Sequence, residues 1–251
     1  HGNYIEFSAI NNSIPTIFIH GVGLDNTMWY PQKDYFHNKS VLFYDLLNHG
    51  KSIGGYRDLS FEIYSNQLFQ IIDELKLEKI NIVGFSIGAL IAQHFTEKFY
   101  EKVNKLVLIG SVYKRSEKQI EIVKNRFSEA INGKSITIDS IKRWFSEKYL
   151  NNNSHVYDFF YNLLEKKKNE DFLPAYKIFV NSDNYNINYS NFNMPTLVMT
   201  GENEIGSTPL MSKGISEKIK NSSLYLIKNA KHGATIEQAE TVNKKINKFL
   251  F

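Results

Sequence analysis

The stretch IVGFSIGALIAQHF, residues 82–95, places Ser86 between two glycines where an apolar run gives way to a helical pattern. Side chains two residues before and after a nucleophile on a tight strand-to-helix turn would collide, which explains glycine at positions 84 and 88. A serine that only caps the helix would explain Ser86 but neither glycine. The spacing therefore predicts a nucleophilic Ser86, with the backbone N–H of Ile87 at the helix start as one oxyanion donor.

A serine hydroxyl attacks a carbonyl only when a base takes its proton. Among the seven histidines, His232 is the candidate base, because NAKHGATIEQAE places it between the last apolar run and the final helical pattern. Such loops open at the carboxyl ends of parallel strands, where open α/β sheets carry their sites. His20 and His49 lie in glycine-rich turns, where local hydrogen bonds account for them.

A third group must orient the base, and the loop TGENEIGSTP offers Glu202 and Glu204. The loop HGVGLDNTMW has glycines that let the backbone turn an N–H inward, and Val22 is the expected second oxyanion donor. A dinucleotide-binding loop is not indicated, because Asn26 stands where a third glycine is needed. No histidine pair has the spacing of metal ligands, so no metal site is expected.

These groups must be positioned by a sheet, and six short apolar runs are typical of strands buried on both faces. The runs occupy residues 16–20, 41–45, 80–85, 105–110, 196–201 and 224–229. Helical spacing follows Ser60, a predicted N-cap, and recurs from Ile236 to Phe249. The alternation predicts an α/β fold with a mainly parallel sheet covered by helices.

The alternation stops between Val112 and about Tyr189, where helical patterns follow one another over residues 120–130, 141–148 and 156–163. A structureless excursion of that length is improbable in a compact domain. We therefore predict a core domain of residues 1–111 and 190–251 and a helical cap of residues 112–189. The aromatic residues Trp29, Tyr113 and Trp144 are candidates for lining a substrate pocket, although packing would also explain each of them.

Composition narrows the class of protein. The chain has 251 residues, 42% of them hydrophobic, enough for one sizeable core. Its 30 Lys and Arg alternate with 26 Asp and Glu, so no nucleic-acid surface is indicated. The absence of cysteine excludes disulfides and a cysteine nucleophile.

No apolar stretch approaches the roughly 20 residues that span a bilayer, and no leader opens the chain, so we expect a cytoplasmic protein by default. The oligomeric state is left open.

The order Ser86, Glu204, His232 and the motifs HGVG, YDLLNHGKS, GFSIG, TGENE and KHGATIEQAE resemble the α/β-hydrolase family over nearly the whole chain. Through MWYPQ, YDLLNHGKS and the Ser-Thr-Pro at 207–209, the chain is most similar to the small esterase and enol-lactonase branch. The resemblance implies a mostly parallel eight-stranded sheet, a helical cap inserted after the sixth strand, and a Ser–acid–His triad that needs no cofactor.

The resemblance also implies that Glu204 is the triad acid. The usual residue at this position is Asp, which is shorter by one C–C bond of about 1.5 Å. Glutamate can serve there only if its loop sits further back from the histidine.

The leading functional hypothesis is a serine hydrolase that cleaves small carboxylic esters or lactones through an acyl-enzyme. A carbon–carbon bond hydrolase of vinylogous diketones would use the same triad. It is less favoured because the cap shows no evident arginine pocket for a substrate carboxylate, with Arg115, Arg126 and Arg143 as the candidates. A receptor-like protein that binds a small ligand without useful turnover is a third hypothesis, against which the intact triad argues.

Overall fold

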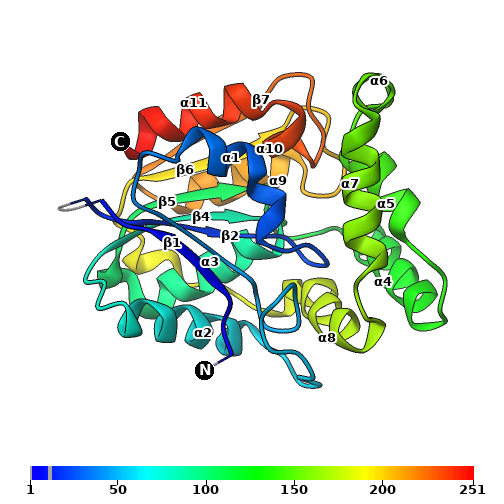
Figure 1. The fold of residues 1–251 in the computed structure, drawn as a ribbon, viewed down its shortest axis with the longest axis horizontal. Helices are drawn as coiled ribbons and strands as arrows, with labels where there is room; N and C mark the ends of the chain where they lie inside the picture. Colours follow the sequence, from blue (N-terminus) through cyan, green and yellow to red (C-terminus); the bar gives the residue numbers. More distant parts are fainter. Residues whose placement is uncertain (1, 11–12) are drawn as a thin grey trace.

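The computed structural model describes residues 2–10 and 13–251, which form a twisted sheet with helices on both faces (Figure 1). The six apolar runs form parallel neighbouring strands, as predicted. These strands are β2 (Thr16–Ile19), β3 (Val41–Tyr44), β4 (Ile80–Phe85), β5 (Val103–Ile109), β6 (Thr196–Gly201) and β7 (Ser222–Ile227). The strand order is β1-β3-β2-β4-β5-β6-β7.

The expected count of eight strands is wrong for the described residues, which contain a sheet of seven. The pattern of apolar runs had indicated six of them, and the number eight came only from the family resemblance. The seventh is β1 (Ile5–Ser8), which pairs antiparallel with β3 at the edge of the sheet. Its residues are only partly buried, so it lacks the continuous apolar run by which the central strands were identified.

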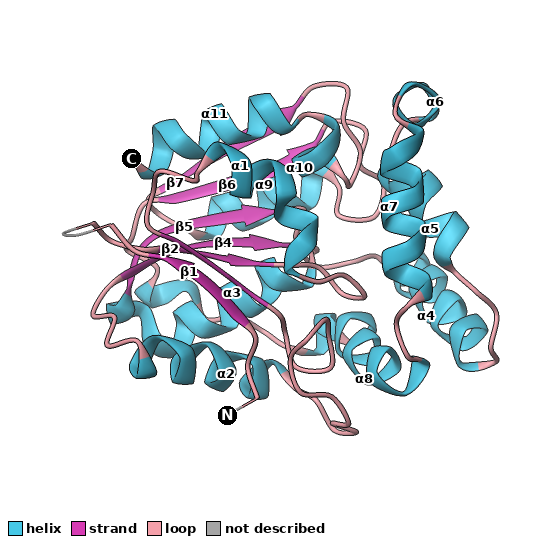
Figure 2. Cartoon of the chain, viewed as in Figure 1, coloured by secondary structure: helices cyan, strands magenta, loops and turns pink. Residues whose placement is uncertain are grey.

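Successive strand residues face opposite layers of the molecule. In β2, Ile17 and Ile19 pack into one apolar cluster while Phe18 packs into the other. The first cluster is covered by α2 (Phe61–Glu74), α3 (Ile87–Phe99) and α9 (Pro209–Lys218), and the second by α1 (Tyr30–Tyr35) and α11 (Ala239–Leu250) (Figure 2). Four 3₁₀ turns are also described: η1 (Asn26–Trp29), η2 (Tyr100–Lys102), η3 (Ser182–Asn184) and η4 (Tyr189–Asn191).

Local capping sets the helix ends. Ser60 is the N-cap of α2, as predicted, and its hydroxyl accepts a hydrogen bond from the Ile63 N–H at 3.1 Å. The C-terminal helical pattern is divided by Gln238, whose backbone leaves the helical region at φ −125° and ψ 39°. A short helix α10 (Ala234–Glu237) therefore precedes α11.

The segment between β5 and β6 is helical and lies beyond the carboxyl ends of the strands (Figure 1). The second predicted pattern is broken at Phe145, which is extended, and a further helix was missed because Pro174 lies inside it. The helices are α4 (Glu117–Ile131), α5 (Thr137–Trp144), α6 (Glu147–Asn152), α7 (Ser154–Glu165) and α8 (Asn169–Val180). The division into core and cap at residues 112 and 189 stays a prediction. Among the helices of the described residues, none combines the length and apolar character needed to cross a membrane.

Candidate active site

Ser86 lies on the sharp turn between β4 and α3. Its backbone adopts φ 57° and ψ −118°, which L side chains rarely populate, and its N–H donates to the Ile109 carbonyl at 2.9 Å. Its hydroxyl makes no capping hydrogen bond to α3. The side chain therefore does not cap the helix. It lines a cavity beyond the carboxyl ends of the strands.

The two glycines that flank Ser86 are required by close backbone approach. A Cβ at Gly84 would lie 2.4 Å from the Gly88 carbonyl oxygen, and a Cβ at Gly88 would lie 2.3 Å from the Ile19 carbonyl oxygen. Both distances are far below van der Waals contact. The steric reason given for these glycines is therefore confirmed, since any side chain would push α3 away from the strands that hold Ser86.

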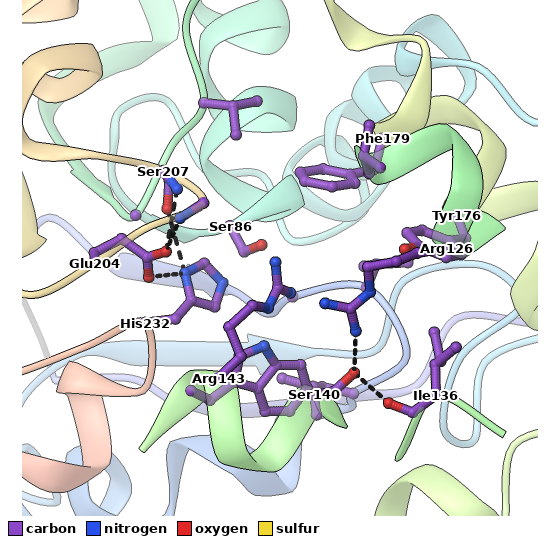
Figure 3. Close-up of a pocket in the computed structure, with 18 of the residues that line it drawn as sticks. Ser86, Arg126, Ile136, Ser140, Arg143, Tyr176, Phe179, Glu204, Ser207 and His232 are labelled. Atoms are coloured by element: carbon purple, nitrogen blue, oxygen red, sulfur yellow. Dashed lines mark hydrogen bonds and ion pairs between the residues drawn. The ribbon is translucent and has the colours of Figure 1, made fainter. Parts of the chain in front are cut away.

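His232 follows β7 and meets Glu204, which follows β6. The imidazole Nδ1 lies 2.7 Å from Glu204 Oε2, and the Ser207 hydroxyl lies 3.3 Å from the same nitrogen. The other carboxylate oxygen, Oε1, accepts hydrogen bonds from the N–H groups of Gly206 at 2.5 Å and Ser207 at 3.2 Å. The carboxylate is thereby fixed by its own loop while one oxygen faces the histidine (Figure 3).

The Glu204 carboxyl group is charged despite its burial. Burial alone would raise its pKa, but the His232 charge and contact, the Gly206 N–H and the Arg143 charge together lower the pKa to about 2. A permanently charged acid is suited to hold one histidine tautomer and to stabilise an imidazolium. This is the role expected of the third triad member.

The structure separates the two candidate acids. Glu202 lies at the exposed surface, where its Oε2 accepts from the Asn229 N–H at 3.4 Å. The side chain of Glu204 is only 1% exposed and reaches His232. Its N–H bonds back to the Gly201 carbonyl at 3.2 Å in a tight turn at the end of β6. That turn offers a physical reason why the longer glutamate fits this position.

Ser86 and His232 line the same cavity, which has a volume of about 180 Å³. Figure 3 shows the imidazole between the Glu204 carboxylate and the side of the cavity on which Ser86 and Arg143 lie. In the part of the chain that the structure describes, no hydrogen bond joins the Ser86 hydroxyl to the imidazole. Catalytic hydrogen bonds often form fully only when substrate is bound.

The expected oxyanion donors lie on two sides of Ser86. Ile87 begins α3, so its N–H has no acceptor within the helix. Val22 lines the cavity, and the next residue, Gly23, donates its N–H to His49 Nε2 at 3.1 Å. His49 therefore holds the loop that carries Val22, through the kind of local hydrogen bond expected for it.

His20 makes hydrogen bonds to the backbone of the same loop and of the segment after β3. Its Nδ1 lies 2.8 Å from the Gly21 carbonyl oxygen, and its Nε2 accepts from the Leu46 N–H at 3.0 Å. Burial lowers the pKa of His20, and burial together with the neighbouring His20 lowers the pKa of His49 to about 3. Both imidazoles are therefore neutral hydrogen-bond acceptors at moderate pH, which suits a structural role.

Of the three aromatic candidates, Trp144 alone lines the cavity. Its ring lies 6.3 Å from the His232 ring. Trp29 is fully buried in the core, where its ring lies 5.2 Å from that of Phe18 on β2 and 6.3 Å from that of Phe85 on β4. Tyr113 lies outside the cavity against α9, where a Cβ on Gly214 would touch its ring at 2.8 Å. The assignments of Trp29 and Tyr113 to the pocket are thus not supported.

The sequence analysis gave too little weight to the polar side chains that the helices between β5 and β6 bring to the cavity, above all Arg126 on α4 and Arg143 on α5. A signal was present. Arg126 lies three residues after Val123 and four before Ala130, on the apolar face of α4. A charged residue on an apolar helix face indicates a functional site more strongly than a charged residue on a polar face does. Within the described residues, no group of three or more His, Cys, Asp or Glu side chains could hold a metal ion.

The arrangement of these residues has counterparts in known proteins. A sequence model described as the alpha/beta hydrolase fold matches residues 15–239. The chain belongs to the α/β-hydrolase family. In this α/β hydrolase, the loops that carry Ser86, Glu204 and His232 follow β4, β6 and β7, at the carboxyl ends of these parallel strands.

Relatives over almost the full length support a hydrolase of the esterase and enol-lactonase branch. This α/β hydrolase is 28% identical over 243 residues to the (E)-2-((N-methylformamido)methylene)succinate hydrolase of Acinetobacter baylyi, covering 94% of this chain and 90% of that protein. It is 22% identical over 248 residues to 3-oxoadipate enol-lactonase 2 of the same species, covering 97% and 91%. The solved enol-lactonase of Burkholderia xenovorans LB400 shares the fold, with a TM-score of 0.90 at 19% identity over 99% and 96% of the two chains.

Proposed function

We propose that this α/β hydrolase cleaves small carboxylic esters or lactones through an acyl-enzyme on Ser86. His232 takes the hydroxyl proton as Ser86 attacks the acyl carbon, and then gives it to the leaving alcohol. The N–H groups of Val22 and Ile87 hold the oxyanion, and Glu204 keeps the imidazole oriented. Water activated by His232 then releases the acid.

One observation carries the proposal. A serine on a strained strand-to-helix turn shares a small cavity with a histidine whose Nδ1 lies 2.7 Å from a buried, charged carboxylate. The strained Ser86 backbone and the removal of a charged carboxylate from water both destabilise the fold. A purely structural role for these residues would require neither. The printed name of one relative, an enol-lactonase, supports lactones as substrates.

The carbon–carbon hydrolase of vinylogous diketones stays a second candidate. The objection to it was the lack of an evident arginine pocket, and Arg126 and Arg143 in fact line the cavity. The triad would act in the same positions on such a substrate. The relative named as an (E)-2-((N-methylformamido)methylene)succinate hydrolase also supports a substrate range wider than lactones.

A substrate panel with a Ser86→Ala variant tests the proposal. We expect the wild-type protein to hydrolyse chromogenic esters or enol-lactones, and kcat to fall by on the order of 10⁴–10⁶ in Ser86→Ala. A phosphonate ester should inactivate the wild type by modifying Ser86, as read by peptide mass. Turnover of diketones but not esters would support the second candidate. Ligand binding without turnover of any class would support the receptor-like hypothesis.

A further inference from the structure

The catalytic cavity carries more positive charge than its acids balance. Four cationic side chains line it: Arg115, Arg126, Arg143 and Lys167. The acidic side chain in the lining is that of Glu204, which already faces His232. Enclosed charges of one sign are costly unless a counter-ion neutralises them.

Arg115 is the cation whose role is structural. Its Nε lies 2.6 Å from Asp183 Oδ2, and its Nη2 donates to the carbonyls of Phe179 and Val180 at 2.9 Å each. These bonds join the segment after β5 to the end of α8. Arg115 therefore has a counter-charge in Asp183, although its Nη1 is buried and makes no hydrogen bond.

Within the residues that the structure describes, Arg143 makes no ion pair. Its Nε is buried and makes no hydrogen bond, and the Nε1 of the adjacent Trp144 is buried and unpaired as well. A Cβ on Gly206 would lie 3.2 Å from Arg143 Nη1, so the guanidinium reaches over the loop that holds Glu204. Burial, and then the charge of Arg126, lower the pKa of Arg143 although Glu204 opposes this. The two guanidinium groups thus repel each other across the cavity.

Among the described residues, Arg126 contacts the neutral side chains of Ser140 and Tyr176 and makes no ion pair. Its Nη2 donates to the Ser140 hydroxyl at 3.2 Å, and that hydroxyl donates to the Ile136 carbonyl at 2.7 Å. This chain of bonds aims the guanidinium toward the cavity without neutralising it. Figure 3 shows Arg143 between His232 and Arg126, so the two cations extend from the proposed reaction centre toward the cap.

We propose that Arg126 and Arg143 bind a carboxylate of the substrate, so that the substrate is an ester or lactone of a short dicarboxylic acid. A carboxylate accepts two parallel hydrogen bonds from a guanidinium and would supply the missing counter-charge. Arg143 and His232 line the same cavity, which favours an acid with few carbons between the scissile carbonyl and the carboxylate. For the ester or lactone group that reacts, the inference rests on the proposed function. For the carboxylate at the other end of the substrate, it rests on Arg126 and Arg143.

Matched pairs of esters test the charge directly. Monoethyl succinate and monoethyl glutarate are compared with ethyl 4-methylpentanoate and ethyl 5-methylhexanoate, in which an isopropyl group replaces the carboxylate. Acid release is followed by titration at constant pH. We expect kcat/KM to be higher for the charged member of one pair by on the order of 10²-fold. Equal or lower values for the charged esters would overturn the proposal.

A charge variant and its control then locate the recognition. Arg126→Gln should reduce the charged-to-neutral ratio of kcat/KM at least about tenfold, and Arg126→Lys should retain part of it. Lys124→Gln removes the same charge from an exposed position of the same helix and should leave the ratio unchanged. Equal ratios in wild type and Arg126→Gln would contradict a carboxylate site at Arg126.

Binding separates this inference from the proposed function. Glutarate is titrated by calorimetry into Ser86→Ala with and without Arg126→Gln, and the arginine variant should weaken binding at least about tenfold. Glutarate binding that depends on Arg126, without hydrolysis of any ester, would retain the carboxylate site and remove the hydrolase proposal. Hydrolysis of the neutral esters without measurable glutarate binding would retain the hydrolase proposal and remove the carboxylate site.

Discussion

Glu204 shows how a single residue can be both buried and charged. Its carboxylate lies between two backbone N–H groups of its own loop on one side and His232 on the other. Glu202 precedes it by two residues but lies at the surface. The distinction arises from the turn at the end of β6, which directs one side chain inward and leaves the other in solvent.

Exchanging each acid for its amide tests that distinction. We expect Glu204→Gln to lower kcat by about 10²–10⁴, because the amide cannot stabilise the imidazolium. Glu202→Gln, the matched control, should stay within a few-fold of wild type. Ester hydrolysis at saturating substrate measures both. The reverse ranking would assign the acid to Glu202, and near-normal activity of the double variant would mean that another group orients His232.

The pKa of Glu204 also predicts how stability depends on pH. The pKa is lowered from 4.5 to about 2 in the folded protein, so its ionisation stabilises the fold above the unfolded value. That stabilisation, about 3 kcal/mol at most, is lost as pH falls through the window from about 4.5 to 2. Denaturant unfolding at pH 7 and pH 3 should show a smaller acid-induced loss of stability in Glu204→Gln than in wild type. Equal losses would contradict a strongly lowered pKa.

At the scale of elements, the loop after β2 depends on a histidine that does no chemistry in the proposed mechanism. His49 Nε2 accepts the Gly23 N–H and so fixes the backbone next to Val22. Its neutral state follows from its low pKa of about 3. The position of Val22, a proposed oxyanion donor, therefore depends on a hydrogen bond made by the loop after β3.

We expect His49→Leu to lower kcat by about tenfold or more with a smaller effect on KM, since oxyanion donors act mainly in the transition state. His49→Gln can still accept the Gly23 N–H and should restore part of the rate. His155→Leu, at an exposed position on α7, serves as the control. Loss of activity that Gln does not restore and that follows the melting temperature would indicate a purely structural histidine.

The elements also show what the sequence could and could not predict. Continuous apolar runs identified β2 to β7, and the Gly-x-Ser-x-Gly spacing identified the turn at Ser86. The edge strand β1 was missed because half-exposed residues produce no such run. Helix α8 was missed because Pro174 interrupts its pattern. The sequence named Arg126 and Arg143 as candidates but did not show that they meet, since the cavity forms only when α4 and α5 pack over the strand ends.

At the scale of the whole molecule, the helices between β5 and β6 contact the loop that carries His232. The Gly233 N–H donates to the Trp144 carbonyl at 2.8 Å, and the Phe145 ring fills the space that a Cβ on Gly233 would need. The residues after α5 therefore pack against the loop that carries His232. Aromatic residues of α5 and α7 also belong to the same apolar cluster as the sheet. The helical segment is continuous with the core on this side.

This continuity predicts that Trp144 shapes the acyl pocket without taking part in the chemistry. Its side chain lines the cavity and is 8% exposed, so Trp144→Ala removes a large apolar group from the cavity wall. We expect the kcat/KM ratio of hexanoate to acetate esters to rise by at least about tenfold, because one further methylene admitted to an apolar pocket already contributes about that factor.

Tyr113→Ala is the matched control, since Tyr113 lies outside the cavity against α9. It should leave the acyl-length profile of wild type unchanged. The full series of 4-nitrophenyl esters, measured with the melting temperature of each variant, separates the two roles of a buried aromatic residue. An unchanged profile with a lower melting temperature in Trp144→Ala would make Trp144 a packing residue, because a wall of the acyl pocket cannot be removed without altering which chains fit.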